Sequence, residues 1–108
     1  MTRKFDTFIG FSIKAGKVVF GADNLRTYRR KIRLIVLSSD VSERTQRDMI
    51  ELATKKNCRV IRLLDGNLED IVFKTNCKVI GLTDINLAQA VLDNSNGIAN
   101  DIGGEINE

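Results

Sequence analysis

Short, uninterrupted apolar runs alternate with amphipathic stretches along most of this sequence, and that alternation limits the possible folds more than any other feature. Residues 34–37 are continuously apolar, as expected for a strand that is covered on both faces of a sheet. Similar short runs rich in β-branched residues occupy 18–20, 59–63 and 78–82. We therefore predict an α/β fold, a three-layer α-β-α sandwich with a four-stranded mixed sheet.

The segments between these runs carry apolar residues at helical spacing. Residues 3–15 place Phe5, Phe8 and Ile9 on one helical face, and Gly16 supplies a left-handed residue that ends the helix. The other predicted helices cover 24–31 after an Asp23 cap, 42–56 with Asp40 and Ser42 as caps, a stretch after Asn67, and a stretch that opens at Thr83 or Asp84.

The 108 residues suffice for a single hydrophobic core. Residues 94–108 are rich in Gly, Asn and acidic side chains, and they cannot bury enough apolar surface to offset the entropy of ordering. We predict an α/β domain over 1–93 and a disordered acidic tail over 94–108. The first residues lack the apolar stretch of a signal peptide and no run is long enough for a bilayer, so we expect a cytoplasmic protein without membrane contact.

Charge is distributed unevenly along the chain. Residues 1–33 hold nine Lys or Arg and two acids, a net charge of +7, whereas residues 94–108 hold three acids and no base. The overall formal charge is only +3. A concentrated positive field is how a small protein attracts a polyanion, so this gradient favours a nucleic-acid partner.

Catalytic chemistry finds little support in the residue types. The chain has no histidine, which excludes Ser-His and Cys-His relays. Glu69 and Asp70 are adjacent on a predicted helix and diverge by about 100°, so they suit a helix N-terminus better than a paired-carboxylate mechanism. Cys58 and Cys77 each precede a strand and are predicted to be small buried hydrophobes, with a reactive thiolate as the alternative. We predict no enzymatic activity, no cofactor and no metal.

A cluster of bases lies between the first and second predicted strands. On a helix over 24–31, Arg26, Arg29 and Arg30 share one face at i, i+3 and i+4 spacing. The few acids nearby in the sequence cannot pair with all of them. The cluster is either a solvated face that aids solubility or a platform for phosphate backbone. Since a single tyrosine interleaves with these bases, the pattern favours a folded RNA shape over stacked single-stranded bases.

Three segments resemble a known family. Residues 8–21 read FIGFSIKAGKVVFG, residues 34–40 read LIVLSSD, and residues 79–84 read VIGLTD. This series resembles the ribosomal protein L-seven-Ae / L-thirty-e family, small proteins that bind kink-turn RNA, and in particular its small bacterial YlxQ-like members. The resemblance implies an α-β-α sandwich without enzymatic activity. It also implies that structured RNA, such as ribosomal RNA, meets the turn before the second helix and the loop between the fourth helix and the fourth strand.

The RNA-reading motif of the family differs in this chain. The family pattern Gly-x-Asn-Glu-x-x-Lys falls on residues 21–27, where Gly21 matches but Asp23, Asn24 and Thr27 occupy the Asn, Glu and Lys positions. An aspartate accepts hydrogen bonds but cannot donate one to guanine O6. The alternative interpretation is therefore a protein-interaction module on the same scaffold that has lost specific RNA recognition.

The partner prediction is structured RNA, with ribosomal or other ribonucleoprotein partners. The predicted RNA-binding residues are Lys14, Lys17, Gly21, Asp23, Asn24, Arg26, Arg29, Arg30, Lys31, Lys74, Thr75 and Asn76.

Overall fold

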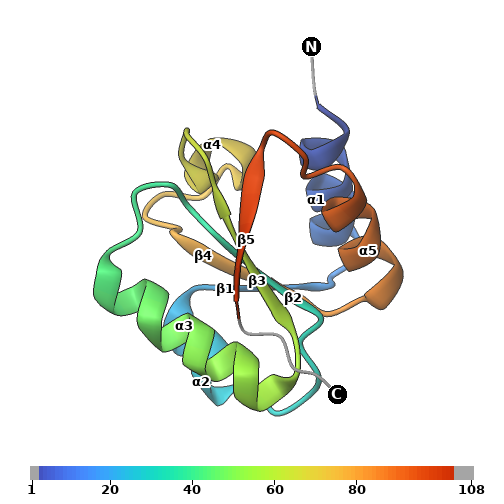
Figure 1. The fold of residues 1–108 in the computed structure, drawn as a ribbon. Helices are drawn as coiled ribbons and strands as arrows, with labels where there is room; N and C mark the ends of the chain where they lie inside the picture. The colour runs from blue at the N-terminus through green and yellow to red at the C-terminus, as the bar shows by residue number, and fades with distance from the viewer. Residues whose placement is uncertain (1–2, 104–108) are drawn as a thin grey trace.

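Helices and strands alternate along residues 3–103, the part of the chain that the computed structural model describes (Figure 1). The helices are α1 (Lys4–Lys14), α2 (Ala22–Thr27), α3 (Glu43–Lys56), α4 (Leu68–Val72) and α5 (Ile85–Asp93). The strands are β1 (Val18–Phe20), β2 (Leu34–Leu37), β3 (Arg59–Leu63), β4 (Val79–Leu82) and β5 (Ala99–Gly103). They form one mixed sheet in the order β1-β4-β2-β3-β5, in which the β2–β3 pair is parallel and the other neighbours are antiparallel.

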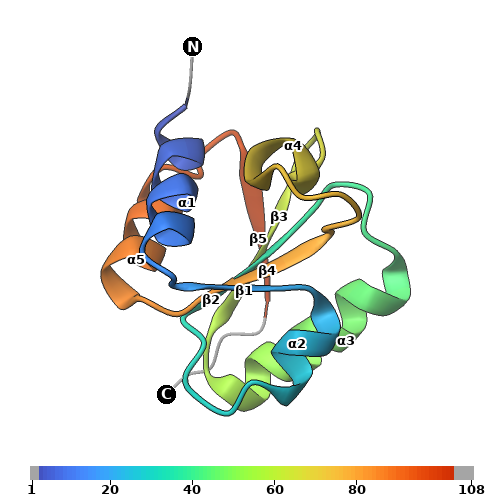
Figure 2. The same ribbon diagram turned by 180° about the vertical axis from the view of Figure 1, so that it is seen from behind.

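Helices cover both faces of this sheet. Helices α1, α4 and α5 lie on one face, and α2 and α3 lie on the other (Figures 1 and 2). The four residues of β2 are all buried because their side chains alternate between these faces. Leu34 and Val36 belong to the core under α1 and α5, whereas Ile35 and Leu37 belong to the core under α3. The continuous apolar run is thus explained, and the predicted mixed α/β class is confirmed.

Several helix boundaries follow the predicted local signals. Gly16 has a φ of 71° directly after α1, and the amide of Lys17 donates to the Ser12 carbonyl at 2.9 Å. The Ser42 hydroxyl caps α3 by accepting from the Thr45 amide at 3.1 Å. The Asp84 carboxylate caps α5 through the Leu87 amide at 2.9 Å. Caps of this kind depend only on a few neighbouring residues.

The predicted four-stranded sheet and disordered tail are corrected by a fifth strand. β5 pairs with the outer edge of β3, with Ala99 opposite Leu63 and Asp101 opposite Ile61. Residues 94–103 are therefore ordered, and 104–108, the rest of the predicted tail, lie outside the described residues. The prediction weighed side-chain burial alone, whereas the main-chain groups of an unpaired β3 edge gain hydrogen-bond partners from any extended segment.

The second helix is also shorter than predicted and is placed differently. It covers Ala22–Thr27 rather than 24–31, and Gly21 rather than Asp23 occupies its N-cap position. Tyr28 then adopts an extended conformation. The ammonium of Lys56, at the end of α3, donates to the carbonyls of Tyr28 and Arg30 at 2.7 and 3.2 Å. These distant bonds stabilise a non-helical loop that no local pattern could indicate.

Helices on both faces are short. No helix within residues 3–103 has both the length and the apolar character that crossing a bilayer demands.

Candidate nucleic-acid interface

The turn after β1 and the loop between α4 and β4 lie side by side, although some fifty residues separate them in the sequence. Together they line an open hollow of about 420 Å³ along the outer side of β1. Figure 2 shows both segments at the same end of the sheet. We call this region the turn surface, and its residues are Phe20, Gly21, Asn24, Lys74, Thr75 and Asn76.

The turn itself is held by backbone geometry. Gly21 has a φ of 89°, a conformation that side-chain-bearing residues rarely adopt, and its amide donates to the Val79 carbonyl at 2.9 Å. The side-chain amide of Asn24 donates to the Phe20 carbonyl at 2.8 Å. These two bonds tie the turn to β4 and to the end of β1, so its exposed backbone is presented in one shape.

The facing loop is constrained as well. Phe73 and Asn76 have φ values of 55° and 62°, the left-handed conformation that favours glycine or asparagine. Lys78 anchors the loop's end through the Asp40 carboxylate at 2.6 Å, and Glu69 lies 3.8 Å away. The Lys74 ammonium lies 5.2 Å from the centre of the Phe20 ring, within the range of a cation–π contact. This contact links the loop to the turn.

Lys14 lies beside the same loop, at the end of α1. It lines a neighbouring hollow with Phe11 and Phe73. Phe73 is 91% exposed and Phe11 is 50% exposed. Aromatic rings this open to water are unusual in a region without a partner, and they offer flat faces for stacking.

The other predicted cations do not join the turn surface. In the sheet register Phe20 faces Ile80 while Val18 and Leu34 both face Leu82, so Lys17 and the start of β2 lie at the opposite end of the sheet from Gly21. Arg29, Arg30 and Lys31 belong to the loop that leads into β2. The predicted single platform is therefore split between two ends of the sheet, because α2 ends before these bases.

Arg26 was predicted to be a free cation on a basic helix face, but the structure shows it paired with two carboxylates. Its guanidinium pairs with Asp23 at 2.5 Å and with Asp48 of α3 at 3.3 Å. Asp23 is 98% exposed, so this pair is weakly held and easily screened by salt. The bases Arg29, Arg30 and Lys31 are exposed and form no ion pair within residues 3–103.

The hydroxyl and carboxyl groups that follow β2 have structural partners. The Ser38 hydroxyl is fully buried, donates to Asp40 at 2.7 Å and accepts from the Leu68 amide at 3.0 Å. The Asp40 carboxylate pairs with Lys78 instead of capping α3 as predicted. Hydrogen bonds from Lys78 and then Ser38 lower the pKa of Asp40 from 3.8. Glu69 and Asp70 lie in the first turn of α4 as expected.

Both thiols are buried, as predicted. Burial raises the pKa of Cys58 to about 11, and burial likewise raises the pKa of Cys77. Such thiols are poor nucleophiles near neutral pH. Within the described range, no set of three acidic or thiol side chains is placed to hold a metal ion.

Sequence reasoning missed the aromatic component of this region. Phe20, Phe11 and Phe73 were assigned to core or left without a role, yet they border the turn surface and its neighbour. The one signal was positional, since Phe20 and Phe73 stand immediately before Gly21 and Lys74.

No protein-family model matches this sequence, and no curated protein does. A solved structure, described as a protein with unknown function from Bacillus halodurans C, matches with a TM-score of 0.73 and 18% sequence identity. The match covers 85% of this chain and 96% of that chain. A likeness at this level of identity concerns the fold, which the two proteins share.

Proposed function

We propose that this chain is a YlxQ-like member of the L-seven-Ae / L-thirty-e family that binds structured RNA, such as ribosomal RNA, in the cytoplasm without catalysing a reaction on it. The observation that carries the proposal is the juxtaposition of the turn before α2 and the α4–β4 loop around one hollow. These are the two segments to which the family resemblance assigns RNA contacts.

The chemistry of the turn surface suits a nucleic acid. Gly21 has no side chain, so a sugar-phosphate backbone can approach the turn closely. Asn76 and Thr75 both donate and accept hydrogen bonds, as reading of base edges and sugar hydroxyls requires. Lys74 supplies a cation for a phosphate, and nearby Phe73 supplies an open ring for an unstacked base.

Specificity and attraction are divided between the two ends of the sheet. The fixed backbone and the amide groups of the turn surface discriminate among RNA shapes. Arg29 and Arg30, exposed in the α2–β2 loop, add attraction to phosphates without reading shape or sequence. Each phosphate that a base neutralises steepens the log–log salt dependence of binding by about 0.7–0.9.

The proposal is tested by comparing a kink-turn RNA with a plain duplex of equal length across a salt series. We expect tighter binding of the kink-turn RNA and a larger share of its affinity to survive at high salt. Lys74→Met should reduce the preference for the kink-turn, whereas Arg29→Glu with Arg30→Glu should weaken both RNAs together. Equal affinity for the two RNAs removes the specificity, and no binding of either at low salt removes the function.

A matched control separates loss of charge from loss of site. Lys55 is an exposed lysine on α3, outside the turn surface. Lys55→Met removes the same charge as Lys74→Met, and we expect it to change kink-turn affinity by less than about twofold. Equal losses from the two variants would show that general attraction, not the turn surface, carries the binding.

The open rings of Phe11 and Phe73 favour a second candidate, a protein-interaction module on the same scaffold. Under this reading, protein purified free of nucleic acid binds neither RNA, and Phe73→Ser releases a defined protein partner that co-purifies. Retention of RNA binding in Phe73→Ser together with absence of a partner would count against it.

A further inference from the structure

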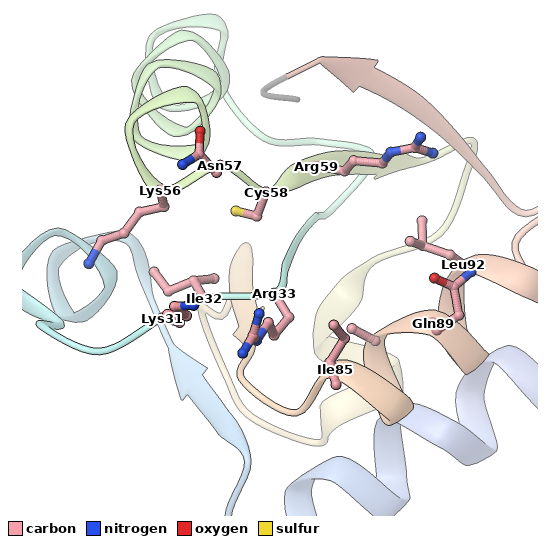
Figure 3. Close-up of a pocket in the computed structure, with 11 residues that line it drawn as sticks. Lys31, Ile32, Arg33, Lys56, Asn57, Cys58, Arg59, Ile85, Gln89 and Leu92 are labelled. Atoms are coloured by element: carbon pink, nitrogen blue, oxygen red, sulfur yellow. The ribbon is translucent and has the colours of Figure 1, made fainter. Parts of the chain in front are cut away.

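A second hollow, of about 310 Å³, lies at the other end of the sheet from the turn surface (Figure 3). Its walls come from the loop before β2, the end of α3, the start of β3 and the first two turns of α5. Four of its lining residues are cationic and none is acidic. We call it the cationic hollow, and its charged residues are Lys31, Arg33, Lys56 and Arg59.

Two of these four cations are already used by the protein itself. The Lys56 ammonium donates to the Tyr28 and Arg30 carbonyls, and in Figure 3 it points away from Arg59. Arg59 lies 3.4 Å from the Asp101 carboxylate on β5. Both charges add to the positive field of the hollow while their own hydrogen bonds are directed elsewhere.

Arg33 is the exception, because its hydrogen bonds are incomplete. Its Nε atom is buried and has no acceptor among the residues described. A buried donor on a charged group without a partner is unfavourable, because the group has lost its water and gained no acceptor. The backbone amide of Arg33 donates to the Leu82 carbonyl at 2.7 Å, which fixes the start of the side chain beside β4. The Arg33 side chain is thus held in the hollow with a buried Nε–H group that lacks an acceptor among the described residues.

The opposite wall is apolar with one amide. Figure 3 shows Ile85 of α5 on the side of the hollow toward Arg33, and Gln89 and Leu92 of α5 on the side toward Arg59. Ile85, in the first turn of α5, is a large apolar side chain that is 57% exposed. A cationic side facing an apolar side suits a ligand with an anionic group on an uncharged body.

We propose that the cationic hollow binds a phosphate group on a mononucleotide-sized body, with Arg33 and Lys31 holding the phosphate and Ile85 and Leu92 contacting the body. Arginine suits this role because its planar fork meets two phosphate oxygens at once. The volume lies at the lower end of the range for small-ligand sites. A free nucleotide and a nucleotide of a bound RNA are the two sources of this chemistry. The site is independent of the proposed RNA contacts at the turn surface.

The test titrates the full chain with AMP, adenosine, inorganic phosphate and a plain RNA duplex, followed by amide NMR shifts or calorimetry. We expect AMP to shift the amides of 31–33 and 85–92, inorganic phosphate to bind more weakly at the same place, and adenosine to bind least. Shifts there with the duplex but not with AMP assign the phosphate to RNA. No shift in these segments with any phosphate at low salt overturns the proposal.

Arg33→Met keeps the length of the side chain and removes its charge, and we expect it to weaken AMP binding by about tenfold or more. Arg44→Met is the matched control, since Arg44 is exposed at the other end of α3. Lys31→Met, at an exposed position, gives the second measurement if Arg33→Met melts early. Equal weakening by Arg44→Met and by the hollow variants overturns the proposal, because general attraction then explains the binding. Lys74→Met should leave AMP binding unchanged, so failure of the RNA proposal is seen separately.

Discussion

The two ends of the sheet carry two different kinds of surface. At the turn surface, backbone conformation sets the shape, through the positive φ of Gly21 and Asn76. At the cationic hollow, side chains set the chemistry, through Arg33 and Lys31 against the apolar side of α5. A surface defined by backbone suits recognition of a shape, and a surface defined by charged side chains suits recognition of a single group. The residues of the basic first third of the chain are thus divided between two surfaces.

The largest effect that we predict concerns the edge strand next to the cationic hollow. Truncation after Asp93 removes β5, exposes the β3 edge and uncovers part of the core beside Leu63. We expect a loss on the order of 4 kcal/mol, and since small domains have about 5–15 kcal/mol in total, the cooperative melt should weaken or vanish. Circular dichroism melting measures it, and an unchanged melting temperature would contradict the assignment of β5 as an integral strand.

Truncation after Gly103 is the control, and it also tests the two ends of the sheet separately. It keeps β5, whose last residue, Gly103, lies opposite Val60 of β3. It removes two acidic residues, Glu105 and Glu108, from the chain. We expect the cooperative melt to remain because β5 is kept, and roughly twofold tighter AMP binding because the chain loses two negative charges. Kink-turn binding at the turn surface should change less.

The second prediction tests what joins the two ends. A Cβ on Gly81 would lie 2.4 Å from the Leu25 side chain of α2 and 3.3 Å from Ile32, just before Arg33. Gly81→Ala should therefore displace α2 and the loop before β2, with a loss of about 1–3 kcal/mol in urea denaturation. Both binding activities should weaken together, since this contact supports the turn and the hollow alike.

Gly10→Ala is the matched control for this substitution. Gly10 lies inside α1, and a Cβ there meets nothing within 4 Å. We expect a gain of about 0.5–1 kcal/mol, because alanine favours the helix. A gain at Gly81 of similar size would show that α2 is not packed tightly against β4.

Whether an element could be predicted from the sequence depended on whether its contacts are local or distant along the chain. The strands through β4, the Ser42 cap of α3 and the Asp84 cap of α5 were predicted correctly because each depends on a few adjacent residues. β5 was missed because its order comes from main-chain pairing with β3, a partner some forty residues earlier. The true end of α2 was missed because Lys56, on α3, supplies the bonds that hold the following loop.

The candidate site was predicted only where family resemblance and local pattern coincide. Gly21, Asn24 and residues 74–76 were named in advance, and the structure brings them to one hollow. Arg33 was not named as a site residue. Its Nε atom lacks an acceptor among the described residues, in a hollow lined by four separate segments, and no spacing in the sequence indicates that these segments meet.

The third prediction separates the two ends. Gly21→Ala places a side chain at a φ of 89°, where a Cβ has free space but the backbone is strained. We expect a stability loss of about 1 kcal/mol and a loss of kink-turn preference, because the turn must change shape. AMP binding at the cationic hollow should remain as it was. Loss of both activities to the same extent would indicate that the ends are not independent.

The smallest effect concerns pH and the anchor of the α4–β4 loop. Hydrogen bonds from Lys78 and then Ser38 lower the pKa of Asp40 below 3.8, and the bond to Asp40 raises the pKa of Lys78 above 10.5. For the carboxyl, a lowered pKa means stability that is present above 3.8 and is lost as pH falls through the folded value. For the ammonium, a raised pKa means stability that is present below pH 10.5 and is lost as pH rises through its folded value.

The melting temperature should therefore be highest between the folded pKa values of Asp40 and Lys78, with a small drop below about pH 4. Asp40→Asn should remove this drop, whereas Asp65→Asn, at an exposed position, should leave it in place. Both partners are partly open to water, so salt should shrink the drop. A drop that persists in Asp40→Asn would place the titrating group elsewhere and leave the turn surface without its acid-sensitive anchor.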